Sequence, residues 1–423
     1  MNAETPGRGK HLVAGGRTFV AAGGGLARLF AGSFSRVVDR IDRGLAQGSL
    51  LARLPDGSIR LLGGRADGPA AEIDLHDWRA IVRLATGGSA GWYQAWEAGE
   101  WDSPDPVQIF ALFMRNAAHL GDVARAKGPW RWAGRALNFV RRNTRKRAKL
   151  NISAHYDLGN DFYAAWLDPT MSYSSALWLG LRADAPMEQA QWNKVDALAA
   201  RLAVQPGDHV LEVGCGWGFL ARRLVQRHGV QVTGISISDE QLDWARAALS
   251  TDPAPGVSYL HEDYRDVTGQ FDAVVSVEMV EAVGREFWPS YFDTLARVLR
   301  PGGRAALQYI SIRDEIFDAY SASADFIQTY IFPGGLLVRE SEFRRLAAER
   351  GLEWRDQVDF GADYARTLNA WRAAFDGALD RGALPGGFDR RFVRLWRYYL
   401  MYCEGGFVGG GIDVSQVTLV KQA

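Results

Sequence analysis

The feature that most constrains the fold of this chain is a regular alternation of β-rich and helical segments that begins near residue 150. The β-rich runs are DHVLEVG, VQVTGIS, GVSYLH, FDAVVSV and RAALQYI, and helical stretches such as EQAQWNKVDALAARLAV and DEQLDWARAALS lie between them. Such alternation is typical of βαβ units, which build a parallel sheet covered by helices on both faces. The sequence therefore predicts an α/β domain over residues 150–423.

A glycine-rich loop, in the segment VLEVGCGWGFL, follows the first of these strands and opens a helix. Gly214, Gly216 and Gly218 let the backbone turn tightly and approach a ligand closely. Their spacing differs from the G-x-G-x-x-G of a dinucleotide site, and no acid stands at the tip of the second strand to hold an NAD ribose. No Gly-Lys-Ser/Thr follows, which excludes a P-loop. With Glu212 before it, the loop fits S-adenosylmethionine (SAM), which has no phosphates to bind; a tight turn without a ligand is the alternative.

Polar residues also stand at the ends of the later strands. HEDYRD, at 261–266, follows the third strand, where an acid can bond the adenine amino group, and the fourth strand ends at Glu278–Glu281. The segment ARVLRPGGRAALQ has the helix, turn and strand that are common late in methyltransferase domains. Because ligands of open α/β sheets bind outside the carboxyl ends of the strands, these segments are expected to converge on the glycine loop.

The chain before residue 129 is predicted to form a tail and a small separate domain. Residues 1–25 are rich in Gly and Ala and are expected to be a flexible tail. Residues 26–128 have helical spacing in ARLFAGSFSRVVDRIDRGL, a hairpin signal at Pro55-Asp56-Gly57, and a second helical run, DPVQIFALFMRNAAHLGDVARA, with Pro106 near its first turn.

Residues 129–149 form a basic linker without acids, in which aromatic residues are interleaved with the charges. A solvated linker or helix face explains such a run. A surface for anionic lipid headgroups explains it equally well, since each Lys or Arg near a membrane contributes ~1 kcal/mol. The basic residues are Arg131, Arg135, Arg141, Arg142, Arg145, Lys146, Arg147 and Lys149.

Composition excludes several classes of protein. Lys plus Arg and Asp plus Glu number 49 each, so no net field attracts nucleic acid, and no nucleic-acid motif is present. Cys215 and Cys403 are too few for a disulfide framework or a zinc cluster, and no histidine–carboxylate cluster has metal-ligand spacing, so no metal is expected. No apolar run approaches the ~20 residues of a spanning helix, and the first residues lack a secretory layout. We therefore expect a cytoplasmic protein whose membrane contact is peripheral.

Several segments, in order, resemble the cyclopropane-fatty-acyl-phospholipid synthase family, which is related to the mycolic acid cyclopropane synthases. They are HYDLGNDFYAAWLDPTMSYSSA, VLEVGCGWGFLA, EDYRD, FDAVVSVEMVEAVG, YIFPGG, FGADYARTL and YYLMYCEGGF. The resemblance implies a class I SAM-dependent methyltransferase with a Rossmann-like, mostly parallel seven-stranded sheet, preceded by a smaller, lipid-associated N-terminal α+β domain. By analogy with longer family members, it also implies a homo-oligomer, such as a dimer.

The resemblance implies a reaction as well. Its substrate is the cis double bond of an unsaturated acyl chain, usually esterified in a phospholipid, and the enzyme would reach it from the inner, anionic membrane surface. The alkene attacks the sulfonium methyl of SAM, a base removes a proton from the resulting carbocation, and a cyclopropane ring closes. In the family, that base is a bicarbonate ion held in the pocket.

Such chemistry needs a tightly positioned alkene and a dry pocket with aromatic faces that stabilise the cation. For any single aromatic residue, core packing is the more common interpretation. The candidates for the pocket lining are Tyr173, Trp178, Tyr309, Tyr364, Tyr398 and Tyr399.

The matching motifs assign roles to individual residues. Glu281 matches the glutamate that hydrogen-bonds the bicarbonate, and it is expected to hold or orient a proton because a carboxylate beside an anion is otherwise repulsive. Its alternative is an acid at a helix N-terminus, favoured by the macrodipole. Tyr364 matches the tyrosine that binds the same ion, and the backbone of Ile310 contributes. The residues expected to contact SAM are Tyr173, Ser174, Glu212, Gly214, Gly216, Gly218, Ser236, Gln241, Glu262, Asp263 and Tyr264.

Two positions depart from the best-known family members. Ser175 stands where they carry Cys and Gln308 where they carry His, and both family residues touch the bicarbonate. Ser can hydrogen-bond an anion, whereas Gln donates from its amide but cannot change charge near neutral pH, unlike His. The pocket is therefore expected either to hold bicarbonate with altered proton handling, or to lose a different proton and give a methyl-branched or methylene fatty acid.

Two other functions fit part of this pattern. A small-molecule C-methyltransferase would share the fold but would need neither the basic linker nor the N-terminal domain. A catalytically silent lipid-binding protein would not need the complete glycine loop together with Glu281 and Tyr364. SAM-dependent methylation of phospholipid acyl chains is therefore the favoured prediction.

Overall fold

The computed structural model describes residues 8–14, 31–121, 158–322 and 325–422. The chain forms two compact units, and each contains separate stretches of sequence. Unit 1 comprises Met1–Arg142, Arg313–Gly334 and Gly386–Ile412, and unit 2 comprises Asn143–Ile312, Gly335–Pro385 and Asp413–Ala423. The sequence predicts instead a linear division near residue 150, because composition does not indicate that two later segments pack with the N-terminal region.

Unit 1 contains a small mixed sheet with the strand order β2-β1-β3-β4. β1 and β2 pair antiparallel, β1 and β3 pair parallel, and β3 and β4 pair antiparallel. The turn between β1 and β2 is closed by the Leu54 amide, which donates to the Ser58 carbonyl over 2.9 Å, so the hairpin expected at Pro55-Asp56-Gly57 is confirmed. The strands are β1 (Ser49–Arg53), β2 (Ile59–Gly63), β3 (Ala70–Leu75) and β4 (Trp101–Asp102).

Helices from both ends of the chain pack together in unit 1. In α17, Gly405 allows close contact with α5, because a Cβ at this position would lie 2.4 Å from Phe110 Cβ. The second helical run expected from the sequence is broken at Asn116, whose side chain binds the backbone of Gln47. The helices are α1 (Lys10–Ala14), α3 (Ala31–Gly44), α4 (Arg79–Glu97), α5 (Pro106–Arg115), α6 (Ala117–Leu120), α14 (Asp314–Ser321), the π-helix η4 (Ile327–Ile331) and α17 (Arg390–Val408).

Unit 2 is built on a seven-stranded sheet with the order β10-β11-β9-β8-β5-β6-β7. The pairs β5–β6, β5–β8, β6–β7 and β8–β9 are parallel, and β10 and β11 are antiparallel to each other. The expected mostly parallel seven-stranded sheet is confirmed. Its strands are β5 (His209–Val213), β6 (Gln231–Ser236), β7 (Val257–His261), β8 (Phe271–Val277), β9 (Leu299–Ile312), β10 (Leu352–Asp359) and β11 (Ile412–Lys421).

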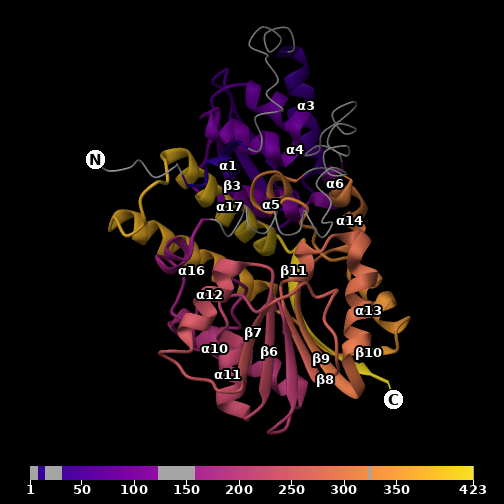
Figure 1. Cartoon of the computed structure of the whole chain (residues 1–423). Helices are drawn as coiled ribbons and strands as arrows, with labels where there is room; N and C mark the ends of the chain where they lie inside the picture. Colours follow the sequence, from indigo (N-terminus) through magenta and orange to yellow (C-terminus); the bar gives the residue numbers. More distant parts are fainter. Residues whose placement is uncertain (1–7, 15–30, 122–157, 323–324, 423) are drawn as a thin grey trace. The chain divides into compact units, whose positions relative to one another are not determined.

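Helices cover both sides of this sheet: α10, α11 and α12 lie on one side and α13 on the other (Figure 1). The central strands are therefore almost wholly buried, which explains their continuous runs of Val, Leu and Ala. The helices of unit 2 are α9 (Asn160–Ala164), α10 (Met187–Leu202), α11 (Phe219–His228), α12 (Asp239–Ala248), η2 (Val280–Ala282), η3 (Arg285–Phe287), α13 (Trp288–Val298), α15 (Glu340–Ala348) and α16 (Gly361–Asp380).

Candidate active site

The glycine loop joins β5 to α11, and its glycines have different roles. All three adopt left-handed backbone conformations, with φ of 82° at Gly214, 51° at Gly216 and 82° at Gly218. A Cβ at Gly218 would lie 2.3 Å from the hydroxyl of Tyr259, whereas a Cβ at Gly216 would meet no described atom within 4 Å. Gly218 thus permits close packing inside the unit, and Gly216 leaves the loop open to a ligand.

Glu212 lies under this loop on β5, where only 4% of its surface is exposed. Burial raises the pKa of its carboxyl from 4.5 to about 8. Its Oε2 atom is buried and has no hydrogen-bond partner among the described residues. An unsatisfied buried oxygen beside an open glycine turn fits a polar ligand such as SAM. The expected cofactor residues around the loop are therefore chemically suited to SAM.

The ends of β6 and β7 bring three more expected cofactor residues together. Ser236 Oγ lies 3.4 Å from Gln241 Oε1, and the Glu262 amide donates to the Ser236 carbonyl over 3.2 Å. Asp263 instead forms an ion pair with Arg265, whose Nη2 lies 2.5 Å from Asp263 Oδ2. The backbone of Glu262 is therefore joined to Ser236 at this edge, whereas the carboxylate of Asp263 is held by Arg265.

Tyr173 and Ser174 are held in place by residues from different elements. The ring of Tyr173 lies between those of Tyr163 and Trp371, with centroids 5.4 and 5.3 Å away. Ser174 Oγ accepts a hydrogen bond of 2.8 Å from Lys194 Nζ on α10. Lys194 is 2% exposed, and burial lowers the pKa of its ammonium group to about 8. This segment is thus a packed loop with a buried cation beneath it.

Glu278 follows β8 directly and is the centre of the site. Its Oε1 accepts from the Ser175 amide at 2.9 Å and from Gln308 Nε2 at 2.8 Å, and its Oε2 accepts from the Tyr364 hydroxyl at 2.7 Å. Its φ of 48° is uncommon for a residue other than glycine, and such strain concentrates at functional sites. Glu278 retains partial exposure, whereas Ser175 and Gln308 are fully buried.

Glu281 lies one turn further along, on η2, and is paired with a backbone group. Its Oε1 accepts from the Ile310 amide over 2.5 Å, and its Oε2 is buried without a partner among the described residues. Burial, and then the charge of Glu278, raise the pKa of Glu281 to about 8. Glu281 is therefore protonated at neutral pH and can donate a hydrogen bond from Oε2, in keeping with the proton-holding role expected for it.

The structure thus brings together the residues that the sequence predicts at the reacting centre. They surround Glu278, a residue to which the sequence motifs gave no role. Ser175, Gln308 and Tyr364 all donate to Glu278. The hydroxyl of Ser175 donates to the Ala176 carbonyl over 3.0 Å, so its backbone amide rather than its side chain contacts the carboxylate. The signal for Glu278 was its place at the end of a strand that leads to the site.

Lys194 is a second residue of the site that no sequence motif indicated. This lysine lies among the buried residues of α10, three residues after Gln191, whose amide donates to the Ser174 carbonyl over 3.1 Å. Gln191 and Lys194 are polar residues three positions apart on the apolar face of a helix, and this spacing is the sequence signal that could have identified them.

Several aromatic residues expected to line the pocket pack elsewhere. Trp178 donates from Nε1 to Thr367, and the ring of Tyr309 packs against Phe343 and Trp354. Tyr398 belongs to the aromatic core of unit 1, where its ring contacts that of Tyr93. Core packing explains these residues, whereas Tyr364 contacts the site through Glu278.

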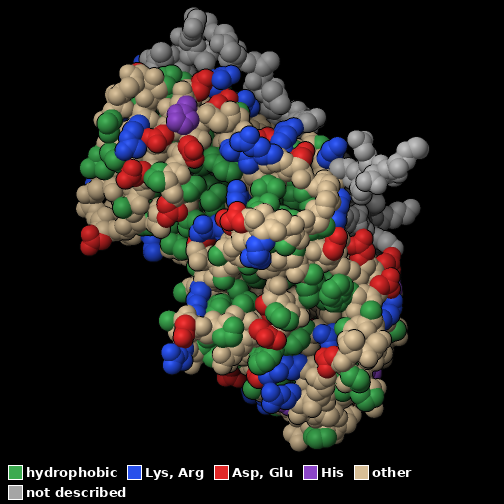
Figure 2. Space-filling view, turned by 90° about the vertical axis from the view of Figure 1, so that its left-hand side faces the viewer, with side chains coloured by type: hydrophobic (Ala, Val, Ile, Leu, Met, Phe, Trp, Pro, Cys, Tyr) green, Lys and Arg blue, Asp and Glu red, His purple; other side chains and the backbone are tan. Residues whose placement is uncertain are grey.

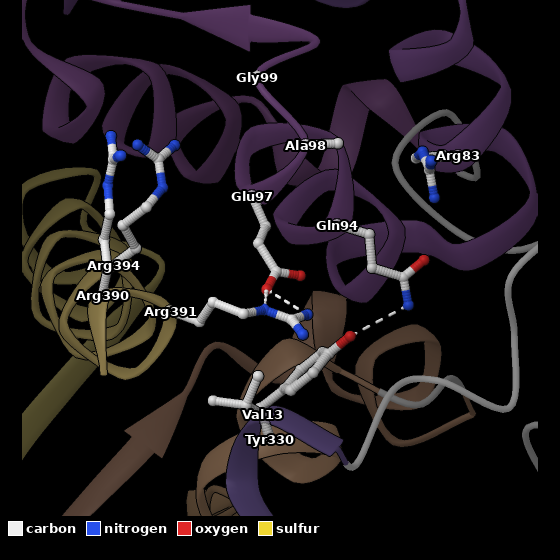
Figure 3. Close-up of a pocket in the computed structure, with 10 residues that line it drawn as sticks. All are labelled: Val13, Arg83, Gln94, Glu97, Ala98, Gly99, Tyr330, Arg390, Arg391 and Arg394. Carbon is white, nitrogen blue, oxygen red and sulfur yellow. Dashed lines mark hydrogen bonds and ion pairs between the residues drawn. The ribbon is translucent and has the colours of Figure 1, made fainter. Parts of the chain in front are cut away.

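Unit 1 contains a pocket of about 650 Å³ that is lined by arginines (Figure 3). Arg391 forms a 2.6 Å ion pair with Glu97, and Gln94 Nε2 donates to the Tyr330 hydroxyl over 3.0 Å. The lining residues come from α1, α4, the turn after α4, η4 and α17, and are Val13, Arg83, Gln94, Glu97, Ala98, Gly99, Tyr330, Arg390, Arg391 and Arg394.

Basic and acidic side chains are interspersed on the face shown in Figure 2, in keeping with the net charge of zero. Among the described helices, none combines the length and the apolar character that crossing a bilayer requires. The basic linker at 129–149 lies outside the described residues.

The sheet order, the glycine loop after its central strand and the acidic groups at the strand ends define a class I SAM-dependent methyltransferase. The model of the mycolic acid cyclopropane synthetase family matches residues 143–417, and the chain belongs to this family.

Individual relatives are similar over most of their length. The chain is 36% identical over 381 residues to the tuberculostearic acid methyltransferase of Mycobacterium tuberculosis, with 85% of each chain covered. It is 34% identical over 358 residues to the cyclopropane-fatty-acyl-phospholipid synthase of Escherichia coli, which covers 83% of this chain and 88% of the relative. The crystal structure of the mycolic acid cyclopropane synthase CmaA1 with SAH superposes with a TM-score of 0.61 at 30% identity, over 64% of this chain and 98% of that one.

Proposed function

We propose that the protein transfers the methyl group of SAM to the cis double bond of an unsaturated acyl chain in a phospholipid, and that loss of a proton then closes a cyclopropane ring. The observation that carries this proposal is the pair of coupled carboxyl groups, Glu278 and Glu281, at the strand end beside the glycine loop. An alkene offers no proton to remove before methyl transfer, but the cation formed afterwards must lose one.

The cofactor would be held by residues already in position. When bound, SAM supplies an electrophilic methyl group on a sulfonium centre. Gly214 and Gly216 let the backbone approach it, Glu212 offers an unsatisfied carboxyl oxygen, and Ser236, Gln241 and Glu262 offer polar groups at the neighbouring strand ends. Tyr173 and Ser174 would close the site from the opposite segment.

The remaining residues handle the acyl chain and its proton. The aromatic cluster of Tyr163, Tyr173 and Trp371 would provide an apolar, π-rich wall that excludes water and favours a cation. The groups expected to hold an anionic base are Ser175, Gln308, Tyr364, Ile310 and Glu281. Bicarbonate, supplied by solvent, is the base that the resemblance to the family implies.

The product depends on which proton leaves the cation. Loss from the transferred methyl group of the first-formed cation closes a ring. If a hydride shift first moves the cation to the methylated carbon, loss from the same methyl group gives a methylene chain, and loss from a neighbouring chain carbon gives a methyl-branched alkene. A methylene or methyl-branched product is the second candidate. It is favoured by Ser175 and Gln308, which replace the Cys and His of the best-known family members, and by similarity to a relative named for tuberculostearic acid. Because the substrate is a membrane lipid, we place the protein at the cytoplasmic membrane surface, in peripheral contact with it.

Vesicles test this proposal directly. Protein, labelled SAM and vesicles of dioleoyl phospholipid are incubated together, and the lipids are then examined by mass spectrometry and proton NMR. We expect acyl chains that gain one CH₂ and show cyclopropane protons far upfield of the alkene signal. Vesicles of fully saturated phospholipid are the control. Intact SAM and unchanged dioleoyl chains would contradict the proposal, and olefinic or methyl-branch signals in the product would select the second candidate.

A further inference from the structure

We propose that the carboxylate of Glu278 is the base that removes the proton from the methylated acyl chain, in place of a bicarbonate ion. This inference rests on the proposed function and names the residue that completes it. The step is balanced within the substrate: a C–H bond of the transferred methyl group breaks, its electron pair forms the bond to the cationic carbon that closes the ring, and the proton passes to the carboxylate of Glu278.

The geometry around Glu278 is that of an anion site already filled by a side chain. Its donors come from three segments: the Ser175 amide, the Gln308 amide group and the Tyr364 hydroxyl, at 2.9, 2.8 and 2.7 Å. These are the groups expected to hold bicarbonate. Since they all point to the carboxylate of Glu278, the chain supplies from its own sequence the negative charge that a bound ion would otherwise bring.

The orientation of Gln308 is fixed by a second glutamine. Gln416 Nε2 donates to Gln308 Oε1 over 3.0 Å, which leaves the amide NH₂ of Gln308 to donate to the Ser175 carbonyl and to Glu278. Arg201 Nε in turn donates to Gln416 Oε1 over 3.2 Å. Gln308 is therefore a neutral donor that positions the carboxylate, and it brings no positive charge for a second anion.

Charge also disfavours bicarbonate beside these groups. The charge of Glu278 raises the pKa of Glu281. A bicarbonate ion at the same place would be repelled by that charge in the same way. Because three donors converge on Glu278, we assign the negative charge of the pair to this carboxyl group. Burial raises the pKa of Glu278, and the hydrogen bonds from Tyr364, Gln308 and Ser175, together with the charge of Lys194, act in the opposite direction and favour the ionised form.

The backbone of Glu278 suggests the decisive variant. At a φ of 48°, glycine is less strained than any other residue, so Glu278→Gly removes the carboxylate and keeps the backbone conformation. It also leaves an empty space between the same donors, in which a small carboxylate such as formate, or bicarbonate itself, fits. Loss of a general base typically costs 100-fold or more in rate, about the effect expected here.

The test compares the full-length protein and this variant in carbon dioxide-free buffer, with dioleoyl phospholipid vesicles. We expect wild-type turnover to be independent of added bicarbonate, and Glu278→Gly turnover to fall about 100-fold and to recover with bicarbonate or formate. SAM binding by calorimetry should stay unchanged. Glu349→Gly, an exposed position in unit 2, is the matched control and should show neither the loss nor the rescue.

Three outcomes decide the matter. Wild-type turnover that requires bicarbonate would overturn the role of Glu278 while leaving the proposed function intact. A wild-type protein that methylates no unsaturated lipid under any condition would remove the proposed function itself. If Glu278→Gly is poorly folded, Glu278→Gln keeps the size of the side chain, and full activity in that variant would equally overturn the proposal.

The arginine pocket of unit 1 leads to a second, independent inference: we infer that it binds a phosphate group, either of a phospholipid headgroup or free in solution (Figure 3). Two of its guanidinium groups are neutralised, since Arg391 pairs with Glu97 and Arg83 with the buried carboxylate of Glu100. Arg390 and Arg394 form no ion pair within the described residues. The pocket therefore carries positive charge with no counter-charge.

Arg394 is held in a fixed position for such a ligand. Its guanidinium lies 4.1 Å above the ring of Trp96, and its Nη2 donates to the Trp96 carbonyl over 2.8 Å. Its Nε is buried and has no hydrogen-bond partner among the described residues. A guanidinium that is fixed by stacking, next to a second arginine on the same helix, suits the tetrahedral oxygens of a phosphate.

Removal of both charges tests this site. The variant carries Arg390→Gln and Arg394→Gln, and the matched control carries Arg345→Gln and Arg355→Gln, which are exposed in unit 2. We expect the first variant to bind inorganic phosphate, by calorimetry, at least about tenfold more weakly than the wild type. Equal weakening toward dioleoyl phosphatidylglycerol vesicles assigns the site to a headgroup, and a loss confined to inorganic phosphate assigns it to the free ion. Unchanged binding of both probes, or the same loss in the control, would overturn the inference.

Discussion

Glu281 shows how one residue can set the pH range of an active site. Its carboxyl is surrounded by protein and lies near a second carboxylate, and both effects raise its pKa to about 8. Because the charged form is disfavoured, Glu281 keeps its proton up to that pH and presents an O–H group to the site. Paired carboxyls with separated pKa values are a recurring arrangement for proton transfer, in which one accepts while the other donates.

Turnover should therefore fall as pH rises through about 8, because Glu281 then ionises and adds a second negative charge next to Glu278. Below that pH, this group imposes no loss. Glu281→Gln carries a permanently neutral amide of the same size, so we expect the alkaline decline to disappear from its rate–pH profile. Initial rates on dioleoyl vesicles between pH 6 and 9.5 measure this, and an identical alkaline decline in wild type and variant would contradict it.

At the scale of single elements, the sequence predicted the strands and helices of unit 2 well. The central strands β5 and β8 are buried on both faces and the helices are amphipathic, so local composition and periodicity match the final structure. The helical run through Asn116 was predicted less well. Its break depends on a side chain that bonds Gln47, 69 residues earlier, and no local pattern contains that contact.

Prediction of the candidate site was limited in the same way. The glycine loop and Ser175, Gln308, Tyr364 and Glu281 were identifiable because each lies in a short motif. The partners that define their roles were not: Gln416 reaches Gln308 across 108 residues, and Tyr364 reaches Glu278 across 86. A motif indicates which residues matter, whereas the direction of each hydrogen bond follows from the packing of distant segments.

At the scale of the whole molecule, the active site has a cost in stability. Glu212 and Glu281 are both placed where burial raises the pKa from 4.5 to about 8, so the folded state binds protons that the unfolded chain has lost. Stability must then decrease as pH rises from about 4.5 to 8, by up to ~1.4 kcal/mol for each pH unit and each group. Lys194 adds no slope in this range, because it is charged in both states until its lowered pKa of about 8 is reached.

The variant Glu212→Gln isolates one of these contributions. Its neutral amide cannot ionise, so we expect it to melt at about the same temperature as the wild type near pH 5 and at a higher temperature near pH 8. Thermal unfolding without ligand, followed by circular dichroism at several pH values, measures the difference between the two curves. Parallel curves would show that the carboxyl of Glu212 is ionised or solvated in the folded protein. Diverging curves would show that burial of the Glu212 carboxyl lowers the stability of the folded protein at high pH. The protein would then keep this acid under the glycine loop at a cost in stability, with its unpaired Oε2 available to a bound cofactor.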